Sequence, residues 1–411
     1  MDLSSLFSIE KANVGLFCDC FPPVMDGVSV CMQNYAEWMQ KKVGETVVVT
    51  PNVPKADYSK LDYKVLDYFS VPIPKRPPYV AGIAEIDPVF LAKISRIKFR
   101  IVHAHCPFTS GLAAMRIARL QKIPLVATFH SKYRDDFARI LPEPAVKAML
   151  KLVVGFYERA DMVWVPQESV VDVIREYGYK GKVEVMDNGS DLVADYPDKY
   201  FADARNRLGI RPEEFVMLFV GQHIWEKNPK LVIEALALLP DIPFRMYFIG
   251  NGYAAQEMKS LVSERGLDSK VTFVGTITDR EKLKDYYAAS DLFLFPSLYD
   301  NAPLVVREAA ALHTPAVMAK GSTASQIITD GADGFLVDND PEKMAELLRK
   351  LVADPARVHR TGIQASKSIV RSWEDCVDEV IDRYNSLLRS WGLDPIDRIE
   401  TLKQSLCLKT K

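Results

Sequence analysis

Phe295-Pro-Ser-Leu-Tyr-Asp-Asn-Ala-Pro-Leu-Val-Val-Arg-Glu-Ala-Ala310 is the stretch of sequence from which the fold can be argued. The apolar run that ends in it predicts a buried strand, and Leu304 is predicted to begin a helix after a short loop. Asp300 lies in that loop, and Glu308 lies just over one turn into the helix, so its carboxylate can face the loop. The first backbone N–H groups of the helix, near Leu304 and Val305, have no partners within it and attract anionic oxygen. A ligand with a phosphate at one end and hydroxyl groups at the other, such as a sugar nucleotide, suits this arrangement.

The same order of strand, loop and helix recurs through the whole chain. Short apolar runs predict strands at 14–18, 47–50, 101–104, within 124–130, and at 162–166, 183–186, 215–221, 244–250, 271–275, 291–295, 315–318 and 334–337. Apolar residues at helical spacing predict helices at 28–42, 111–120, 142–159, 229–239 and 373–391. The segment 51–78, rich in Pro, Tyr and Lys, predicts an irregular surface segment. This alternation indicates parallel, doubly wound α/β sheets that bind ligands at the carboxyl ends of their strands.

Two domains are expected, because 411 residues exceed what a single hydrophobic core usually holds. Turn residues and a loss of apolar periodicity indicate a linker at Asp187-Asn-Gly-Ser-Asp191. We therefore predict a Rossmann-like domain at 1–190 and a second one at 191–372, followed by a helix and a tail at 373–411.

Composition argues against several classes of protein. The formal net charge of −2 gives no support for nucleic-acid binding, and the single glycine after the first strand, Gly27, is too few for a dinucleotide fingerprint. The six cysteines have neither CxxC pairs nor metal-ligand spacing, which favours reduced, structural thiols. The sequence has no basic start and no run approaching the ~20 apolar residues of a membrane helix, so a cytoplasmic protein is expected.

Two further features have competing interpretations. The helix at 142–159 carries basic residues; a core-facing helix is the simpler interpretation, and an amphipathic helix on the inner face of a membrane is the alternative. His103, His105 and His130 fall at predicted strand ends. If the strand continues through His103 and His105, their side chains project to opposite faces, which argues against a shared metal ion.

In their order along the chain, the motifs resemble those of retaining glycosyltransferases of family 4. The opening stretch resembles the carboxylate-x7-Glu signature, and 221–227 resembles the pattern Gly-Arg-x-x-x-Glu-Lys. The runs His-Ala-His-Cys-Pro-Phe at 103–108 and Thr-Phe-His-Ser-Lys-Tyr at 128–133 resemble a bacterial subset that glycosylates lipids. The resemblance implies the GT-B fold, in which two Rossmann-like domains face a cleft and the helix at 373–391 crosses back to the first domain.

The resemblance also implies roles for particular residues. It implies that His130 contacts the transferring sugar, that Lys227 grips the diphosphate, that Asp300 holds the sugar hydroxyls and that Glu308 holds the ribose. The residues that it places in donor binding are Gly27, Gly221, Gln222, Lys227, Asn301, Ala302, Leu304, Val305 and Glu308. Four residues depart from the family pattern: Asp26 and Pro303 replace glycines, Gln222 replaces an arginine and Asp300 replaces a glutamate. We expect the hydrogen bonding to the donor to differ accordingly.

The implied activity is transfer of a sugar, with retention of configuration, from a nucleoside diphosphate donor to a lipid or glycan acceptor. The resemblance implies no metal and no other cofactor, and UDP-glucose is the donor expected from its frequency in the family. A catalytically silent regulator that binds nucleotide sugars is the alternative, favoured by the changes at Gln222, Asp300 and Pro303. A glycan phosphorylase with pyridoxal phosphate shares the architecture but needs a much longer chain.

Overall fold

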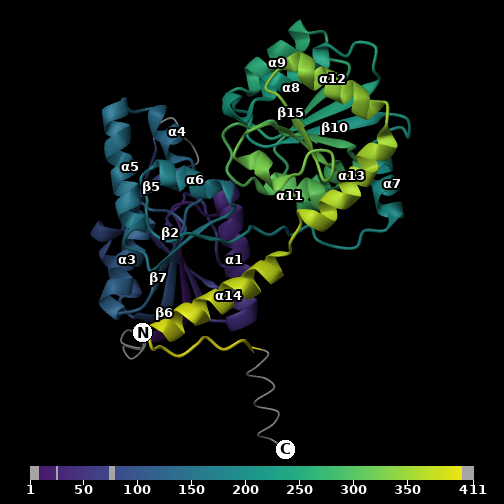
Figure 1. Ribbon diagram of the computed structural model, residues 1–411. Helices are drawn as coiled ribbons and strands as arrows, with labels where there is room; N and C mark the ends of the chain where they lie inside the picture. Colours follow the sequence, from purple (N-terminus) through teal and green to yellow (C-terminus); the bar gives the residue numbers. More distant parts are fainter. Residues whose placement is uncertain (1–8, 25, 74–78, 400–411) are drawn as a thin grey trace, which may run out of the picture. The chain divides into compact units, whose positions relative to one another are not determined.

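The computed structural model describes residues 9–24, 26–73 and 79–399, which form two compact units (Figure 1). Unit 1 contains the chain up to Asn188 and again from Trp373, and unit 2 contains Gly189–Ser372. The limits predicted from the sequence are 190 and 372. Residues 400–411 of the predicted tail, including Cys407, lie outside the described residues.

Unit 1 is built on a seven-stranded parallel sheet with the order β3-β2-β1-β6-β7-β8-β9. Its strands are β1 (Glu10–Phe17), β2 (Thr46–Pro51), β3 (Lys64–Tyr68), β6 (Ile97–Ala104), β7 (Leu125–Thr128), β8 (Met162–Val165) and β9 (Glu184–Val185). The carboxyl-terminal halves of β1 and β6 and the whole of β7, at the centre of the sheet, are buried because helices cover both faces of a parallel sheet.

The prediction of an irregular segment at 51–78 was wrong in part. The segment contains β3 and also β4 (Ser70–Pro72), which pairs antiparallel with β5 (Val80–Gly82). These strands were missed because β3 is an edge strand whose polar residues alternate with buried ones, so it has no continuous apolar run. Residues 74–78 lie outside the described residues.

The helices of unit 1 are α1 (Gly27–Val43), η2 (Ala84–Ile86), α2 (Pro88–Ile94), α3 (Thr109–Gln121), α4 (Tyr133–Ala138), α5 (Glu143–Tyr157), α6 (Ser169–Glu176) and α14 (Trp373–Ser390). Helix α14 packs against α1, and Lys42 of α1 donates to Glu374 and Asp378 of α14 at 2.6 and 3.0 Å. Unit 1 is therefore completed by residues from the far end of the chain.

Unit 2 has a six-stranded parallel sheet with the order β12-β11-β10-β13-β14-β15. Its strands are β10 (Phe215–Val220), β11 (Phe244–Ile249), β12 (Val271–Gly275), β13 (Leu292–Leu294), β14 (Ala316–Ala319) and β15 (Phe335–Val337). The direction in which strands are added reverses between β10 and β13. In open α/β sheets ligands bind beside the carboxyl ends of the strands at such a reversal.

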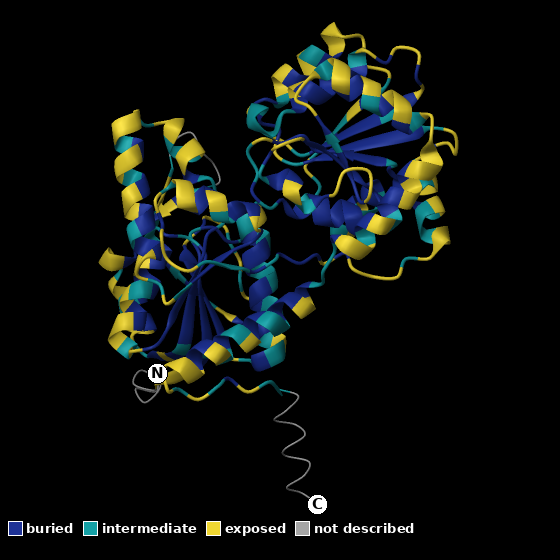
Figure 2. Cartoon of the chain, viewed as in Figure 1, coloured by how far each residue is buried: buried dark blue, intermediate teal, exposed yellow. Residues whose placement is uncertain are grey.

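Helices cover the sheet of unit 2 and leave its strands buried, apart from the edge strand β12 (Figure 2). They are α7 (Asp198–Arg207), η3 (Trp225–Lys227), α8 (Pro229–Ala237), α9 (Ala255–Glu264), α10 (Arg280–Ala289), α11 (Leu304–Ala311), η4 (Ala324–Ile327), α12 (Pro341–Val352) and α13 (Pro355–Ser368). No helix among the described residues is long and apolar enough to cross a membrane.

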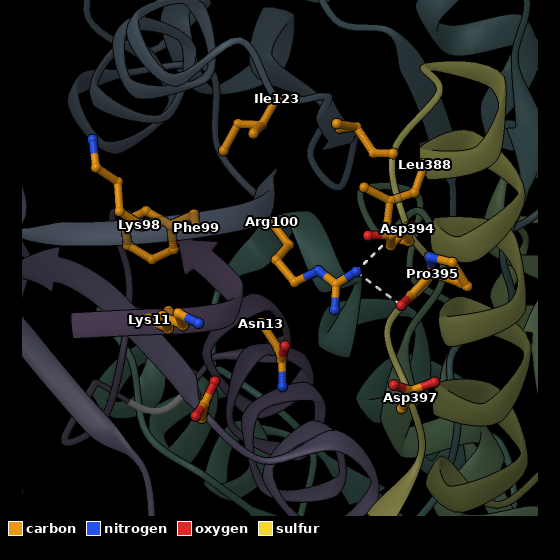
Figure 3. A pocket seen from close by; sticks show the side chains of 13 residues that line it. Lys11, Asn13, Lys98, Phe99, Arg100, Ile123, Leu388, Asp394, Pro395 and Asp397 are labelled. Atoms are coloured by element: carbon orange, nitrogen blue, oxygen red, sulfur yellow. Dashed lines mark hydrogen bonds between the residues drawn. The ribbon is translucent and has the colours of Figure 1, made fainter. Parts of the chain in front are cut away.

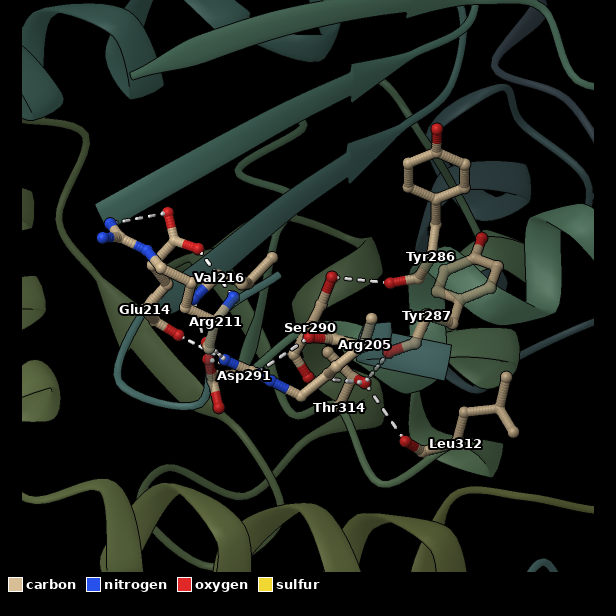
Figure 4. Close-up of polar contacts among 11 residues, drawn as sticks. Arg205, Arg211, Glu214, Val216, Tyr286, Tyr287, Ser290, Asp291, Leu312 and Thr314 are labelled. Carbon is tan, nitrogen blue, oxygen red and sulfur yellow. Dashed lines mark hydrogen bonds and ion pairs between the residues drawn. The ribbon is translucent and has the colours of Figure 1, made fainter. Parts of the chain in front are cut away.

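A group of polar contacts fixes the carboxyl end of α10 beneath this sheet (Figure 4). The Thr314 hydroxyl donates to the carbonyl oxygen of Tyr287 at 2.7 Å. Arg205 donates to the carbonyl oxygen of Ala289 at 3.1 Å, and Asp291 accepts from the backbone N–H of Val216 at 2.7 Å. The carboxyl end of α10 is therefore tied to α7 and to the loop before β14, and Asp291, just before β13, is tied to β10.

Candidate active site

An ion pair joins the two loops that follow β10 and β13, the neighbouring strands at which the strand order of unit 2 reverses. Lys227, at the end of η3 after β10, donates from Nζ to both carboxylate oxygens of Asp300, at 2.6 and 2.7 Å. Asp300 lies in the loop after β13, where the Ser297 hydroxyl also donates to it at 2.5 Å. The side chains of Lys227 and Asp300 are only 12% and 17% exposed. Two predicted site residues are thus in direct contact, and each neutralises the charge of the other.

Glycines in the loops after β10 and β11 allow the two loops to pack closely against each other. Gly221 has a φ of 156°, which residues with a Cβ rarely adopt. A Cβ added at Gly250 would lie 1.9 Å from the carbonyl oxygen of Gly221, and one at Gly252 would lie 2.3 Å from that of His223. The loop after β11 therefore packs directly on the loop after β10, next to the exposed residue Gln222.

Glu308 is buried on α11 and is held by α10. Its two carboxylate oxygens accept from the Arg280 guanidinium at 2.9 Å and from the Tyr287 hydroxyl at 2.8 Å. Arg280 also donates to Asp191, at 2.6 and 3.0 Å. Burial lowers the pKa of Arg280, but the nearby charges of Glu308 and Asp191 outweigh burial and raise it. The Glu308 carboxylate is thereby fixed in position and compensated in charge.

Helix α11 begins where it was predicted, at Leu304. Its N-cap residue is Pro303, and no side chain caps the N-terminus. Leu304 is buried, Val305 is half-buried, and Asn301 and Ala302 lie just before the helix. The uncapped amino end of α11 provides positive potential next to the loop of Asp300.

In unit 1 the predicted residue His130 lies beside two other histidines. His105 follows β6 directly, and its Nδ1 lies 3.0 Å from Nε2 of His130, which follows β7. Burial lowers the pKa of His130 to about 4. The pKa of His105 is far below its usual value because of burial and of the two neighbouring imidazoles. Both rings are neutral near pH 7.

The expectation that His103 and His105 point to opposite faces was wrong. Residues two positions apart in a strand share a face, and the two ring centroids lie 4.1 Å apart although β6 itself ends at Ala104. His103 is fully buried, and its ring nitrogens lie 2.6 Å from the Tyr384 hydroxyl and 2.7 Å from the Thr128 hydroxyl. These contacts give His103 the structural role that is usual for a strand-end histidine.

Gly27 is the first residue of α1, and a Cβ there would meet no atom within 4 Å. Asp26 is the N-cap of this helix and accepts from the backbone N–H of Ser29 at 2.8 Å. It also accepts from the Cys20 thiol at 3.0 Å and from the Tyr79 hydroxyl at 3.1 Å. Asp26, which stands where the family pattern has a glycine, therefore places a carboxylate of the protein itself at the positive amino end of α1.

A pocket of about 720 Å³ lies at the amino ends of the strands of unit 1, opposite the carboxyl ends that carry the histidines (Figure 3). Residues at the amino ends of β1 and β6, such as Lys11 and Lys98, line it together with Leu393 and Asp394. Arg100 reaches across it and donates to the carbonyl oxygen of Pro395 at 2.8 Å. No predicted site residue lines this pocket, so it is separate from the carboxyl-edge residues.

Sequence reasoning did not identify Arg280, Tyr287 or the contact of His105 with His130. One signal was available for the first two: they are seven residues apart, which places them on one face of α10 two turns apart. No sequence signal showed that this face meets Glu308.

In comparisons with known proteins, two family models match the two halves of the chain. Residues 25–193 match the family model described as "Glycosyltransferase Family 4", and residues 201–368 match the one described as "Glycosyl transferases group 1". The chain is 24% identical over 349 residues to an alpha-monoglucosyldiacylglycerol synthase of Acholeplasma laidlawii, covering 82% of this chain and 87% of that protein. It is 30% identical over 302 residues to a D-inositol 3-phosphate glycosyltransferase of Xylanimonas cellulosilytica, covering 70% and 72%.

Solved structures agree in fold. The structure of Anabaena Alr3699/HepE in complex with UDP and glucose superposes with a TM-score of 0.73 at 18% identity, covering 90% of this chain and 99% of that one. Sucrose-phosphate synthase from Thermosynechococcus elongatus gives a TM-score of 0.74 at 20% identity, covering 93% and 100%.

Proposed function

Because this chain belongs to glycosyltransferase family 4 and has the GT-B fold, we propose that it transfers a hexose from a nucleoside diphosphate sugar to a lipid, with retention of anomeric configuration. The observation that carries the proposal is the contact between Lys227 and Asp300 at the strand reversal of unit 2, in front of the uncapped helix α11. This is the place where open α/β sheets bind ligands, and it offers a cation, a carboxylate and free amide dipoles together.

The main task of such an enzyme is to stabilise the departing diphosphate. Donors and dipoles that are already in place when charge develops lower the barrier most effectively. We assign this task to Lys227 and to the amino end of α11 at Leu304 and Val305. Since these groups supply positive potential themselves, the proposed reaction needs no metal ion and no other cofactor. Asp300, once Lys227 turns to the phosphate, would accept hydrogen bonds from the sugar hydroxyls.

The ribose is assigned to Glu308. A carboxylate oxygen has two lone pairs, so each oxygen of Glu308 can accept from a ribose hydroxyl while it keeps its contact with Arg280 or Tyr287. Gly27, Gly221, Gln222, Asn301 and Ala302 are proposed to line the donor, and His130 of unit 1 is proposed to contact the sugar.

UDP-glucose is the proposed donor, supported by the relatives that carry glucosyl-transfer names and by the neighbour solved with UDP and glucose. A diacylglycerol-type lipid is the proposed acceptor, supported by the name of the Acholeplasma relative. Helix α5 buries Val146, Leu150 and Val153 in the core of unit 1, so the core-facing interpretation is confirmed. The solvent-exposed residues of α5 include Leu152, at 69%, together with Lys147 and Lys151, and we propose that they touch the membrane that holds the acceptor.

The test is turnover of UDP-glucose with vesicles that contain diacylglycerol, in the presence and absence of EDTA. We expect a glucosylated lipid by mass spectrometry, with an α linkage by NMR and the same rate in EDTA. A β-linked product would contradict retention. UDP-glucose binding without any turnover over long incubation, with a panel of donors and acceptors, would instead favour the silent regulator.

A further inference from the structure

Three potential metal ligands meet in unit 1 at the carboxyl edge of its sheet. The Sγ of Cys31 and one ring nitrogen each of His105 and His130 all lie within 4.8 Å of one another. Cys31 comes from the second turn of α1, while His105 and His130 follow the neighbouring parallel strands β6 and β7. Adjacent parallel strands end at the same edge, which explains why two residues 25 positions apart meet.

The set of donor atoms selects a class of metal ion. Two imidazole nitrogens and one thiol are typical ligands of Zn²⁺ and of similar borderline or soft cations, and they bind Mg²⁺ or Ca²⁺ poorly. Zinc lies about 2.0–2.3 Å from such ligands, so donor atoms in a tetrahedral site are roughly 3.3–3.8 Å apart. Here Nδ1 of His105 and Nε2 of His130 are 3.0 Å apart, and all three ligand atoms lie within 4.8 Å of one another. Side-chain adjustments of about 1 Å would complete the geometry.

The polar atoms of this cluster are incompletely satisfied within the protein. Nε2 of His105 is buried and has no hydrogen-bond partner among the described residues, so no acceptor or donor fixes the tautomer from that side; with the ring proton on Nε2, Nδ1 keeps a lone pair for a cation. The Cys31 thiol has Oδ1 of Asn188 as an acceptor only at the long distance of 3.6 Å. His130 is less buried than the other two, so an ion can approach from its side.

We propose that Cys31, His105 and His130 form a binding site for Zn²⁺ or a similar thiophilic divalent cation, with the fourth position open to solvent. The neutral imidazoles bind through ring nitrogen lone pairs. The Cys31 thiol binds as thiolate: the S–H bond breaks, the Zn–S bond forms and one proton leaves to the buffer. Burial raises the pKa of this thiol, so the metal ion must displace the proton.

The site has a consequence for the activity, and this part rests on the proposed function. A cation bound to His130 removes that imidazole from the sugar, so Zn²⁺ acts as an inhibitor and not as a cofactor. Mg²⁺, which disfavours sulfur and nitrogen ligands, leaves the activity unchanged.

The experiment measures metal binding directly on the full-length protein with reduced thiols. Zn²⁺ is titrated against a chromophoric chelator for the wild type, Cys31→Ala, His130→Asn and the control Cys18→Ala, which removes another buried thiol of unit 1 that contacts Cys20 and Cys106. We expect one equivalent of Zn²⁺ in the wild type and the control, and affinity reduced at least about tenfold in the other two variants. Co²⁺ should give a thiolate-to-metal absorption band in the near ultraviolet that disappears in Cys31→Ala. Circular dichroism checks that each variant is folded.

Equal Zn²⁺ affinity in the wild type and folded Cys31→Ala would overturn the site, as would loss of binding in Cys18→Ala alone. The activity assay separates this proposal from the proposed function. Zn²⁺ that binds through Cys31 without inhibiting turnover would support the metal site and would contradict the contact of His130 with the sugar. Inhibition by Zn²⁺ that is lost in Cys31→Ala would support both.

Discussion

Lys227 is paired with Asp300, and this contact determines what either residue can do when a donor binds. A partly buried ion pair gains little net stability, because the attraction is offset by the loss of hydration of both ions. Removing one partner is more costly than removing both, because the other charge stays unpaired. A diphosphate can therefore draw Lys227 away from Asp300 at moderate cost, provided that the sugar hydroxyls replace the lysine.

Lys227→Ala should lower kcat/KM for the donor by about 10²–10³, the scale of losing one donor that stabilises the leaving group. Steady-state kinetics on UDP-glucose measure the change. Lys230→Ala, which removes an exposed lysine three residues further on, is the matched control and should have no effect. Unchanged kinetics in folded Lys227→Ala would reject its role at the diphosphate.

Arg280→Ala should raise KM for the donor, with a smaller change in kcat, because it releases the Glu308 carboxylate proposed to hold the ribose. It should also lower stability, because Glu308 is buried and loses its countercharge. Arg265→Ala is the control: it removes an arginine of unit 2 that pairs with Glu234 near the surface. Equal KM values for the two variants would show that Arg280 does not position Glu308.

The residues of the site differed in how far the sequence could predict them. Glu308 was identifiable because its spacing from Asp300 and the start of α11 both follow from local sequence. Its partner Arg280 was not, because a contact between two helices depends on the packing of the whole unit. His105 is a different case: residues two positions apart in a strand share a face, so its place beside His103 was predictable from the sequence.

At the scale of secondary structure, α14 is the element with the most far-reaching contacts. It buries Trp373 and Tyr384 completely in unit 1, although it is separated in sequence from the rest of that unit by all of unit 2. The Tyr384 hydroxyl and Nδ1 of His103 are 2.6 Å apart in the interior. Helix α14 is thus bound to the centre of the sheet by a buried polar contact as well as by apolar packing.

Tyr384→Phe should reduce the free energy of unfolding of unit 1 by about 1–3 kcal/mol, since it leaves a buried nitrogen of His103 without its partner. Tyr63→Phe is the matched control, because the buried Tyr63 hydroxyl has no partner among the described residues; it should be neutral or slightly stabilising. Urea unfolding measures both. Equal stability of the two variants would mean that the Tyr384 contact contributes nothing.

Most elements were predictable because the strands of covered parallel sheets are continuous apolar runs. Strand β10 is buried along its entire length, and so is β2. Strands β3 and β4 were missed because edge strands face solvent and need no such run. Their position depends on pairing with β2 and β5, which local sequence does not encode.

At the scale of the whole molecule, three clustered histidines, two of them fully buried, make unit 1 sensitive to acid. Folded His130 has a pKa of about 4, against about 6.5 in an unfolded chain, and the pKa values of His103 and His105 are lowered as well. Between pH 6.5 and 4 the unfolded chain binds protons that the folded unit does not. The free energy of unfolding therefore decreases as the pH falls through this range.

We expect His130 alone to contribute about 2–3 kcal/mol to this decrease. Tryptophan fluorescence during urea unfolding can follow it, since four of the five tryptophans lie in unit 1. His130→Gln should show a smaller decrease between pH 7 and pH 4.5 than the wild type. The same decrease in both proteins would mean that His130 protonates normally in the folded state.

The chain leaves unit 1 after Asn188 and returns to it at Trp373, so unit 2 is one continuous segment while unit 1 is made of two. A ribosome that synthesises the protein completes unit 2 as soon as Ser372 emerges, before unit 1 has received α14. Unit 2 can therefore mature first, although its sequence comes second. Until α14 arrives, the nascent first unit exposes the apolar surface that Trp373 and Tyr384 later cover, and this interval is when the protein most needs a chaperone.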